Sequence, residues 1–592
     1  MKLLRLKITD PAGFRSLPCG FEHHFRTEWI LQDELENFDG FAPFVCAGPN
    51  GSGKSNLLEV LTAIFFQLEI SRVRRSFLPE VLQSEDLDFS PVAFELDYLI
   101  RVPTEYSRPV GVVWAKVGVW KQPGEPVRFQ WENQGEFNTD AHEAFNGGHA
   151  DILLPQYVLG YSSGDNEILS LPFFKLRFVQ FDEYWNALTQ QLPYPGRPET
   201  RLAYLDNGFS QAILLCNLLF QDDATLQPFR EDVGIEALKE FRIIIKRSID
   251  VSVKQATQLT SGDYVLPGYS EDGYFADNPA ISLSEETGGY VVNLIHLLEG
   301  NERSSIIEKL KRCATLSYQD DATDTLILDY RVTEETRKAF AANFTDALEL
   351  FQAFQVLLTL NLYSVSDTLK ADLYQSPSHY VSETVPTLAS DQRIMRFKYV
   401  RFSKKGVDQP MMLKELSDGE HQLLHSLGLC LLFRNTNSLF LLDEPETHFN
   451  PDWRANFITR LRQCLPATGN VGQEMLITTH SPFLISDSKP DKVLVFEKDK
   501  TNGTISIKNP EYNTLGASIN KITMETFDKQ ETIGQRANQL LHDLLSDPTA
   551  QSNPHELAKR IMETIGDSIE RTFAVQSVLT HSDRPKFGSE PN

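Results

Sequence analysis

The stretch Gly48-Pro49-Asn50-Gly51-Ser52-Gly53-Lys54-Ser55 decides the fold. It matches the phosphate-binding pattern G-x-x-x-x-G-K-[ST], and it stands between a short apolar segment, residues 44–47, and a stretch with helical apolar spacing, 56–68. In such a loop the backbone N–H groups converge on phosphate oxygens, and the following helix adds its positive N-terminal end. The sequence therefore predicts a nucleoside triphosphate site in an α/β fold.

Two side chains of this loop have specific expected roles. Lys54 would reach the β- and γ-phosphates of ATP, and the Ser55 hydroxyl would ligate Mg²⁺. The predicted ATP-binding residues are the whole loop and the residue after it, namely Gly48, Pro49, Asn50, Gly51, Ser52, Gly53, Lys54, Ser55 and Asn56.

A second motif, residues 438–445, is an apolar run that ends in the carboxylates Asp443 and Glu444. A buried strand delivers the side chains at its carboxyl end to the ligand crevice of an α/β sheet. Asp443 would hold Mg²⁺, directly or through water, and Glu444 would orient or deprotonate the attacking water. Paired with the phosphate loop, this motif predicts ATP hydrolysis.

Just upstream, Leu416-Ser417-Asp418-Gly419-Glu420 precedes a helical stretch. This segment resembles the L-S-G-G-Q signature of the ABC-type ATPase superfamily, and Asp418 and Glu420 look like the S-x-G-E form of its SMC/RecF/OLD branch. The resemblance implies that Ser417 and Gly419 face the γ-phosphate held by a second protomer, so that two copies dimerise around ATP.

Further segments extend this resemblance. The run 446–451 looks like the D-loop of OLD-like ATPases, with Asn450 where a histidine is common, and 478–482 resembles their switch segment, in which His480 would contact the γ-phosphate. Residues 13–17 look like the opening of the same branch, which implies that Arg15 lies near the nucleotide. A Q-loop glutamine is expected between the two halves, and Gln156 and Gln180 remain open alternatives.

The expected fold is α/β: an ABC-type (P-loop NTPase) head split by a mostly helical insert, with a helical C-terminal extension. The expected divisions are 1–205 for the first part of the head, 206–391 for the insert, 392–510 for the second part, and 511–592 for the extension and a flexible tail after about residue 581. Alternation of apolar residues predicts strands that include 92–100, 110–120, 127–131, 152–160 and 173–181. Helical spacing predicts helices in the insert at 211–220, 235–249, 291–298 and 344–362.

Composition limits the partners of this chain. Its 592 residues include 56 Lys and Arg against 81 Asp and Glu, a net charge of −25, which excludes nonspecific polyanion binding over the whole surface. Nucleic acid would need a local basic patch, and three clusters are candidates: the densest, Arg72 with Arg74 and Arg75; Lys246-Arg247; and Arg401 with Lys404-Lys405. Scattered cysteines and apolar runs far shorter than a membrane span predict a cytoplasmic protein without membrane contact.

The region after residue 496 has no strand ending in the Glu and Asp-x-Asp set of a Toprim nuclease. Segments 514–520 and 533–545 look similar to stand-alone ATPases of Septu and retron-associated anti-phage systems. The resemblance implies an ATP-driven switch of bacterial defence that senses nucleic acid and controls a separate nuclease or toxin docked on the C-terminal helices. A RecF-like repair ATPase and a slow nucleotide-dependent scaffold remain alternatives. The apolar face of 533–545 would dock that partner or pack on the ATPase head.

Overall fold

The computed structural model places most of the chain. The residues that it does not describe are 37–40, 74–77, 79–81, 83–88, 109–112, 139–149, 164–166, 168, 199, 252–277, 285–287, 301–304, 377–384, 466–471, 500, 502, 528–532, 547–552 and 583–592.

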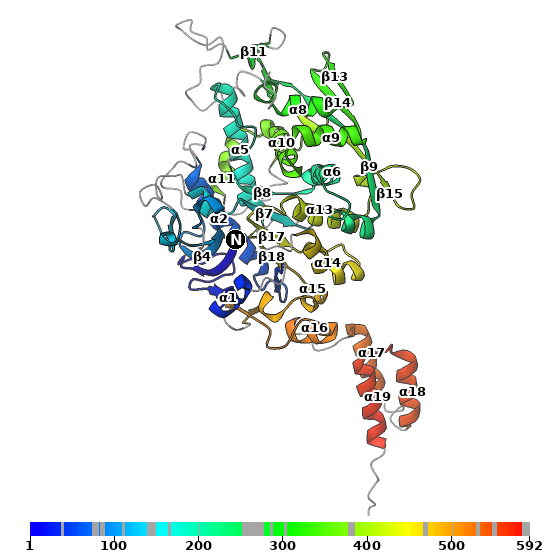
Figure 1. Cartoon of the computed structure of the whole chain (residues 1–592). Coiled ribbons are helices and arrows are strands. Elements are labelled where there is room, and N and C mark those ends of the chain that lie inside the picture. Colours follow the sequence, from blue (N-terminus) through cyan, green and yellow to red (C-terminus); the bar gives the residue numbers. More distant parts are fainter. Residues whose placement is uncertain are drawn as a thin grey trace, which may run out of the picture.

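A seven-stranded sheet forms the centre of the molecule (Figure 1). Its order is β20-β19-β3-β18-β17-β7-β8, in which the strands from β19 to β8 pair in parallel and β20 is antiparallel. The central strands are buried along their whole length because both faces of the sheet are covered, and their inner positions are apolar. The bounds are β3 Phe44–Ala47, β7 Tyr157–Ser162, β8 Leu202–Tyr204, β17 Ser438–Asp443, β18 Glu474–Thr478, β19 Val493–Lys498 and β20 Ile505–Lys508.

Alternate residues of these strands enter two hydrophobic cores. In β3, Phe44 and Cys46 join the core under α2, and Val45 and Ala47 join the core under α6 and α13. The confirmed phosphate-loop helix α2 therefore lies on one face and the signature helix α13 on the other. The helices concerned are α2 Lys54–Arg72, α5 Ser170–Thr189, α6 Ser210–Phe220, α13 Asp418–Leu432, α14 Pro451–Cys464 and α15 Pro482–Ser486.

An antiparallel sheet, β2-β1-β4-β5-β6, packs on the α2 side and confirms the strands predicted at 92–100 and 127–131. The strand predicted at 110–120 is confirmed from Trp114 onward, and residues 110–112 lie outside the described residues. The bounds of this sheet are β1 Lys2–Ile8, β2 Glu22–His24, β4 Phe94–Arg101, β5 Trp114–Lys121 and β6 Arg128–Trp131. The helical segments of this region are α1 Glu28–Glu36, η2 Thr104–Tyr106, η3 Gln134–Glu136 and α4 Ala150–Leu153.

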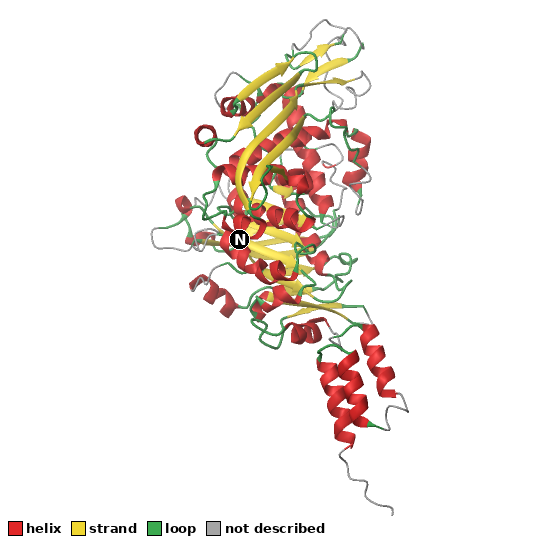
Figure 2. Ribbon diagram, turned by 90° about the vertical axis from the view of Figure 1, so that its right-hand side faces the viewer, coloured by secondary structure: helices red, strands yellow, loops and turns green. Residues whose placement is uncertain are grey.

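The insert is mixed rather than mostly helical in its described residues (Figure 2). Two sheets, β13-β14-β9-β15-β16 and β10-β12-β11, pack beside its helices. The insert contributes β9 Ile235–Lys246, β10 Ser248–Val251, β11 Ile281–Leu283, β12 Tyr290–Asn293, β13 Leu316–Asp320 and β14 Thr325–Arg331. The other two strands of the larger sheet, β15 Met395–Lys404 and β16 Met411–Met412, come from the segment expected to be the second part of the head. The helices are α8 Ile306–Cys313, α9 Glu334–Asn343, α10 Ala347–Thr359 and α11 Asp367–Gln375. Short turns of helix complete the region and its flanks: η4 Asn207–Phe209, η5 Phe229–Val233, η6 His296–Leu298, η7 Leu360–Ser364, η8 Leu413–Glu415 and η9 Pro490–Lys492.

Two of the four helices predicted for the insert were wrong, whereas 211–220 and 344–362 are helical as expected. Segment 235–249 forms β9 and the start of β10, and 291–298 forms the end of β12 and a short 3-10 turn. The pairing of β9 with β15 shifts register three times, and such bulges locally break the two-residue alternation of a strand. Buried Ile235, Leu238 and Phe241 therefore recur at a three-residue spacing, which imitates a helix.

The strand predicted at 173–181 was also wrong, because this segment belongs to the helix α5. This helix is buried on most of its circumference, so its sequence lacks the polar stripe that identifies a surface helix. A Cβ atom on Gly160 would lie 2.4 Å from the Phe173 ring, so the glycine allows α5 to approach β7 closely.

The C-terminal extension has two parts. Helix α16, Ile519–Phe527, packs on the head through Ile522, which is fully buried in the main core. Helices α17 Gln535–Ser546, α18 Pro554–Thr564 and α19 Ile569–Ser582 form a bundle with its own small core, which projects from the body in Figure 1. Among the described residues, the apolar face of 533–545 belongs to the small core that α17 forms with α18 and α19, separate from the cores of the ATPase head. The predicted flexible tail lies outside the described residues.

No single helix in the described part of the chain is both long and apolar enough to cross a bilayer. One pair, Ala347–Ser364 with Asp367–Gln375, meets the length and composition criterion only jointly, across a bend of 106°.

The two-part extension makes a prediction about stability. A chain lacking residues 533–592 should keep the melting temperature of the full chain, because the cluster removed packs on itself. A chain lacking 516–592 also loses Ile522, and removing a buried isoleucine costs on the order of 2–5 kcal/mol. This shorter chain should therefore melt several degrees lower in scanning calorimetry. Equal melting temperatures for the two truncations would contradict the division between α16 and the bundle.

Candidate nucleotide-binding site

The phosphate loop has the backbone that its glycines predict. Gly48, Gly51 and Gly53 have φ angles of 136°, 72° and 94°, in the region that side chains rarely adopt. A Cβ atom on Gly48 would lie 2.5 Å from the Phe496 carbonyl oxygen. The Lys54 ammonium donates to the carbonyl oxygens of Gly48 and Pro49, both at 3.1 Å. The buried ammonium thus points into its own loop, and burial lowers its pKa.

The register of the parallel strands brings the second motif to this loop. Cys46, Thr478 and Asp443 lie in one row across β3, β18 and β17, at the carboxyl edge of the sheet. The Ser55 hydroxyl donates to Asp443 Oδ1 at 2.8 Å, and the Thr478 hydroxyl donates to the same oxygen at 2.6 Å. Burial raises the pKa of Asp443, although both hydroxyls and Lys54 oppose the shift.

This donor set fits Mg²⁺. A serine hydroxyl and a carboxylate oxygen converge at hydrogen-bonding distance, and hard oxygen ligands of this kind are those that Mg²⁺ prefers when phosphate oxygens complete its shell. Ser55 and Asp443, the two predicted metal ligands, are therefore the residues that would hold the ion.

Glu444 and His480, the two predicted catalytic residues, lie together. The His480 Nε2 atom is 3.3 Å from Glu444 Oε1, and both side chains are about a third exposed. The hydrogen bond from His480 lowers the pKa of Glu444. Glu444 has a φ of 48°, an unfavourable angle for a glutamate, and its N–H donates to Thr478 Oγ1 at 3.0 Å. Strain of this kind is typical of functional sites, and here it aims the carboxylate at the histidine.

Sequence reasoning missed a buried carboxyl beside this pair. Glu446 accepts a hydrogen bond from the Thr479 hydroxyl, which in turn accepts from the N–H of Ser481 at 2.8 Å. Its second carboxyl oxygen is buried without a hydrogen-bond partner in the described structure. Burial raises the pKa of Glu446 to about 7. Glu446 thus joins the turn after β17 to the switch segment, a role that its place in the D-loop motif alone does not indicate.

The signature segment forms the start of α13. Ser417 is exposed and caps the helix: its N–H donates to Glu420 Oε2 at 2.9 Å, and its hydroxyl oxygen accepts from the Glu420 N–H. A Cβ atom on Gly419 would lie 2.7 Å from the His448 carbonyl oxygen, so the glycine allows the D-loop segment to pack closely. In the described structure no hydrogen bond or ion pair joins Ser417 or Gly419 to the phosphate loop of the same chain.

The predicted Arg15 lies beside the phosphate-loop helix but pairs with Glu59, with Nη2 and Oε1 2.9 Å apart. The neighbouring Ser16 hydroxyl donates to Asn56 Oδ1 at 2.5 Å, so the predicted Asn56 side chain bonds the Arg15 loop.

Neither Q-loop alternative reaches the site. The Gln156 side chain accepts from the Asn437 N–H at 2.7 Å, at the amino edge of the sheet. Gln180 is buried on α5 and donates to the Thr200 hydroxyl. At the carboxyl end of β7, the Ser163 hydroxyl instead lies 2.9 Å from that of Thr447.

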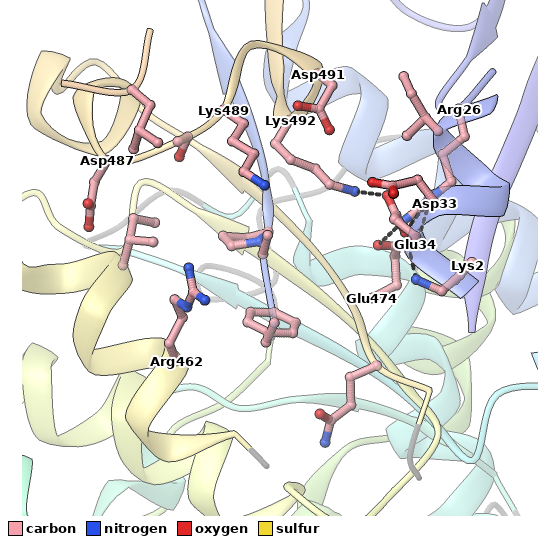
Figure 3. Close-up of a pocket in the computed structure, with 18 of the residues that line it drawn as sticks. Lys2, Arg26, Asp33, Glu34, Arg462, Glu474, Asp487, Lys489, Asp491 and Lys492 are labelled. Atoms are coloured by element: carbon pink, nitrogen blue, oxygen red, sulfur yellow. Dashed lines mark hydrogen bonds and ion pairs between the residues drawn. The ribbon is translucent and has the colours of Figure 1, made fainter. Parts of the chain in front are cut away.

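A pocket of about 490 Å³ lies at the opposite, amino edge of the sheet (Figure 3). On one wall, Arg26 pairs with Glu474 at 2.7 Å, and Glu34 contacts Arg26, Lys2 and Lys492. These cations hold the pKa of Glu34 well below its usual range although burial would raise it. None of the predicted site residues lines this pocket, and its ion pairs tie the N-terminal segment to β18 and β19.

One comparison with known protein families identifies an AAA domain within the chain. A family model described as an AAA domain, putative AbiEii toxin of a type IV toxin–antitoxin system, matches residues 322–486. That segment contains Ser417, Asp443, Glu444 and His480. The match supports an AAA-type ATPase domain that includes this part of the chain.

Two relatives are more distant. Protein ea59 of Escherichia phage lambda is 26% identical over 175 residues, which are 29% of this chain and 31% of ea59. The chain thus spans about a third of the length of this curated relative. The SMC head, in a crystal structure with the C-winged helix domain of ScpA, has a TM-score of 0.32 and 11% sequence identity, over 86% of this chain and 97% of that chain.

The raised pKa of Glu446 predicts a pH-dependent stability. The folded protein keeps this carboxyl protonated up to about pH 7, whereas the unfolded chain ionises it near its ordinary value, so folding loses stability as the pH rises between the two. A shift of this size corresponds to roughly 3 kcal/mol. Glu446→Gln should therefore raise the melting temperature at about pH 8, and the gain should vanish toward about pH 4.5.

Glu444→Gln is the matched control two residues away. The folded-state pKa of Glu444 is lowered, so its ionised form stabilises the protein above the unfolded pKa, and the amide should bring no gain at high pH. A gain for Glu446→Gln that is the same at all pH values would contradict the buried neutral carboxyl.

Proposed function

We propose that the protein binds ATP·Mg²⁺ at the carboxyl edge of the central sheet and hydrolyses it. The observation that carries this proposal is the contact between Ser55 and Asp443, which are 388 residues apart in the chain and 2.8 Å apart in space. This contact between the end of the phosphate loop and the acidic strand end supports a single shared site. The matched AAA domain supports the same activity.

Each residue of the site has a defined task in this proposal. Lys54 would leave the Gly48 and Pro49 carbonyl groups to hold the phosphate chain. Mg²⁺, when bound at Ser55 and Asp443, neutralises charge on the phosphate oxygens. Glu444 would accept the proton of the attacking water. His480 orients Glu444 through their hydrogen bond and would lie beside the γ-phosphate.

We also propose that two copies close around ATP through their signature helices. Ser417 is exposed at the N-terminus of α13 and bonds only within its own capping turn among the described contacts, so it is available to a second protomer. A helix N-terminus is a favourable site for an anion such as a γ-phosphate. The Gln422 side chain accepts from the His448 N–H at 3.0 Å, which links the signature helix to the D-loop segment.

The biological role that we propose is an ATP-driven switch of bacterial anti-phage defence that senses nucleic acid and controls a separate nuclease or toxin. The description of the matched domain as part of a toxin–antitoxin system supports a role in bacterial defence. The effector would dock on the bundle of α17 to α19, where Ile569 and Phe573 are exposed one helical turn apart on α19. An exposed aromatic side chain of this kind is a typical interface anchor.

The catalytic assignment predicts the behaviour of Glu444→Gln. This variant should bind ATP as the parent does and lose at least about 100-fold in turnover, because the amide keeps the shape but cannot accept the proton. Light scattering should then detect an ATP-dependent dimer. Lys54→Ala, the control, should fail to bind ATP and remain monomeric. Parental turnover by Glu444→Gln would show that the two carboxylates of this motif have been assigned the wrong roles.

The effector proposal predicts the behaviour of the double variant Ile569→Ser/Phe573→Ser. Both side chains are exposed, so the bundle should fold and ATP turnover should not change. Co-purification with the product of a neighbouring nuclease or toxin gene should be lost. Lys559→Ser, an exposed change on α18, is the matched control and should bind as the parent does. Retained co-purification by the double variant would exclude this docking site.

A further inference from the structure

The outer face of the five-stranded insert sheet is open. In β9 the side chains of Phe241, Ile243 and Ile245 are buried, whereas Arg242 and Ile244 between them are only half-buried. Helices α6, α8 and α10 contact strands of this sheet. The long strands run along the side that faces the viewer in Figure 2.

Cross-strand pairing orders this face into four rows. Each row is a set of residues paired across neighbouring strands, in the order β13, β14, β9, β15 and β16. The rows are Arg331, Glu240, Arg401 and Met412; Leu316, Asp329, Arg242 and Tyr399; Tyr318, Ile327, Ile244 and Arg396; and Asp320, Thr325 and Lys246.

The charge of this face is opposite to that of the molecule. The rows contain five cations against three anions, a net charge of +2, whereas the whole chain carries −25. Four of the five cations are arginines, of which Arg242 and Arg401 are paired with Asp329 and Glu240. Arg331, Arg396 and Lys246 are the cations that would contact phosphate groups on this face. A local positive field on an acidic protein selects an anionic partner for this face.

Aromatic rings stand among these arginines. The guanidinium groups of Arg242 and Arg401 lie 5.6 and 4.6 Å from the centre of the Tyr399 ring. Asp329 fixes Arg242 by two hydrogen bonds of 2.6 and 2.7 Å, and Glu240 fixes Arg401 at 2.6 Å. On the edge strand, Leu316 and Tyr318 are 58% and 56% exposed on this same face. The face therefore presents rigid flat groups beside positive charge.

We propose that this face binds single-stranded nucleic acid. Bases that are not paired can stack on exposed aromatic and guanidinium planes, while cations hold the phosphates. A duplex hides its base faces and would use the cations alone. The inference rests on the nucleic-acid sensing in the proposed function. It names the binding surface, this face of the insert sheet, and the ligand, a single strand rather than a duplex.

The assignment revises the sequence prediction of the basic patch. Lys246 and Arg401, from two different clusters, lie on this same face, in its last and first rows. Their neighbours do not join them, because Arg247 pairs with Glu299 and Lys404 pairs with Glu420. In the cluster that the sequence favoured, Arg72 pairs with Glu69, and Arg74 and Arg75 lie outside the described residues.

The test is fluorescence anisotropy with labelled oligothymidylate, oligouridylate and a duplex of the same length, at several salt concentrations. The full-length triple variant Tyr318→Ser/Lys246→Gln/Arg396→Gln should lose roughly tenfold or more in affinity for the single strands. The slope of the logarithm of the binding constant against the logarithm of the salt concentration should become shallower by about 1.4, because two cations are removed. Basal ATP turnover should not change, since none of the three residues lies at the nucleotide site.

Arg72→Gln/Arg74→Gln/Arg75→Gln is the matched control and should bind the single strands as the parent does. Unchanged binding by the Tyr318 triple variant, or tighter binding of duplex than of single strands, would overturn the inference. So would a parent that binds no oligonucleotide but loses a protein partner in the triple variant, which would make the face a protein interface. Failure of the ATPase proposal would be seen separately, because the parent protein would then show no ATP turnover.

Discussion

The register of β3, β18 and β17 is the constraint on which the site depends. Backbone hydrogen bonding between these strands aligns Cys46, Thr478 and Asp443 in one row, and the phosphate loop begins two residues beyond Cys46. A slip of one residue would turn Asp443 to the other face of the sheet, because side chains alternate along a strand. The apolar residues of β17 fix the register, since alternate side chains enter the cores on the two faces. The hydrophobic cores thus set the contact between Ser55 and Asp443.

Around that contact the protein holds groups that are costly to bury. Asp443 and Glu446 are buried carboxyls with raised pKa values, and Glu444 has a strained backbone. The Thr478 hydroxyl donates a hydrogen bond to Asp443, and the Thr479 hydroxyl donates one to Glu446. Folded proteins keep strained or poorly solvated groups where function requires them, and the surrounding packing sustains them. The opposite edge of the sheet differs, because there Arg26 and its partners form ion pairs that tie elements together.

The insert shows where reading from sequence fails. Local periodicity predicted 235–249 as a helix, yet pairing with β15 makes it a strand, and the bulges in that pairing disguise its alternation. The same pairing brings Lys246 and Arg401 onto one face, although 154 residues separate them in the sequence. Two of the basic clusters found in the sequence each contribute one residue to this face, namely Lys246 and Arg401. Only the register separates Lys246 from Arg247, which turns away to pair with Glu299.

The sequence by itself identified the phosphate loop and the two carboxylates at a strand end, because local spacing and flanking elements suffice to define these motifs. The signature serine and the switch histidine were indicated by resemblance to a family, and the roles of all these residues stay predictions. It also determined the central strands and the helices with clear apolar spacing. The tertiary structure alone decided what depends on contacts between distant segments. These are the pairing of Glu444 with His480, the burial and raised pKa of Glu446, the burial of Ile522 apart from the terminal bundle, and the arginine face of the insert sheet. Local periodicity cannot contain them, because strand register and burial arise from partners far away in the chain.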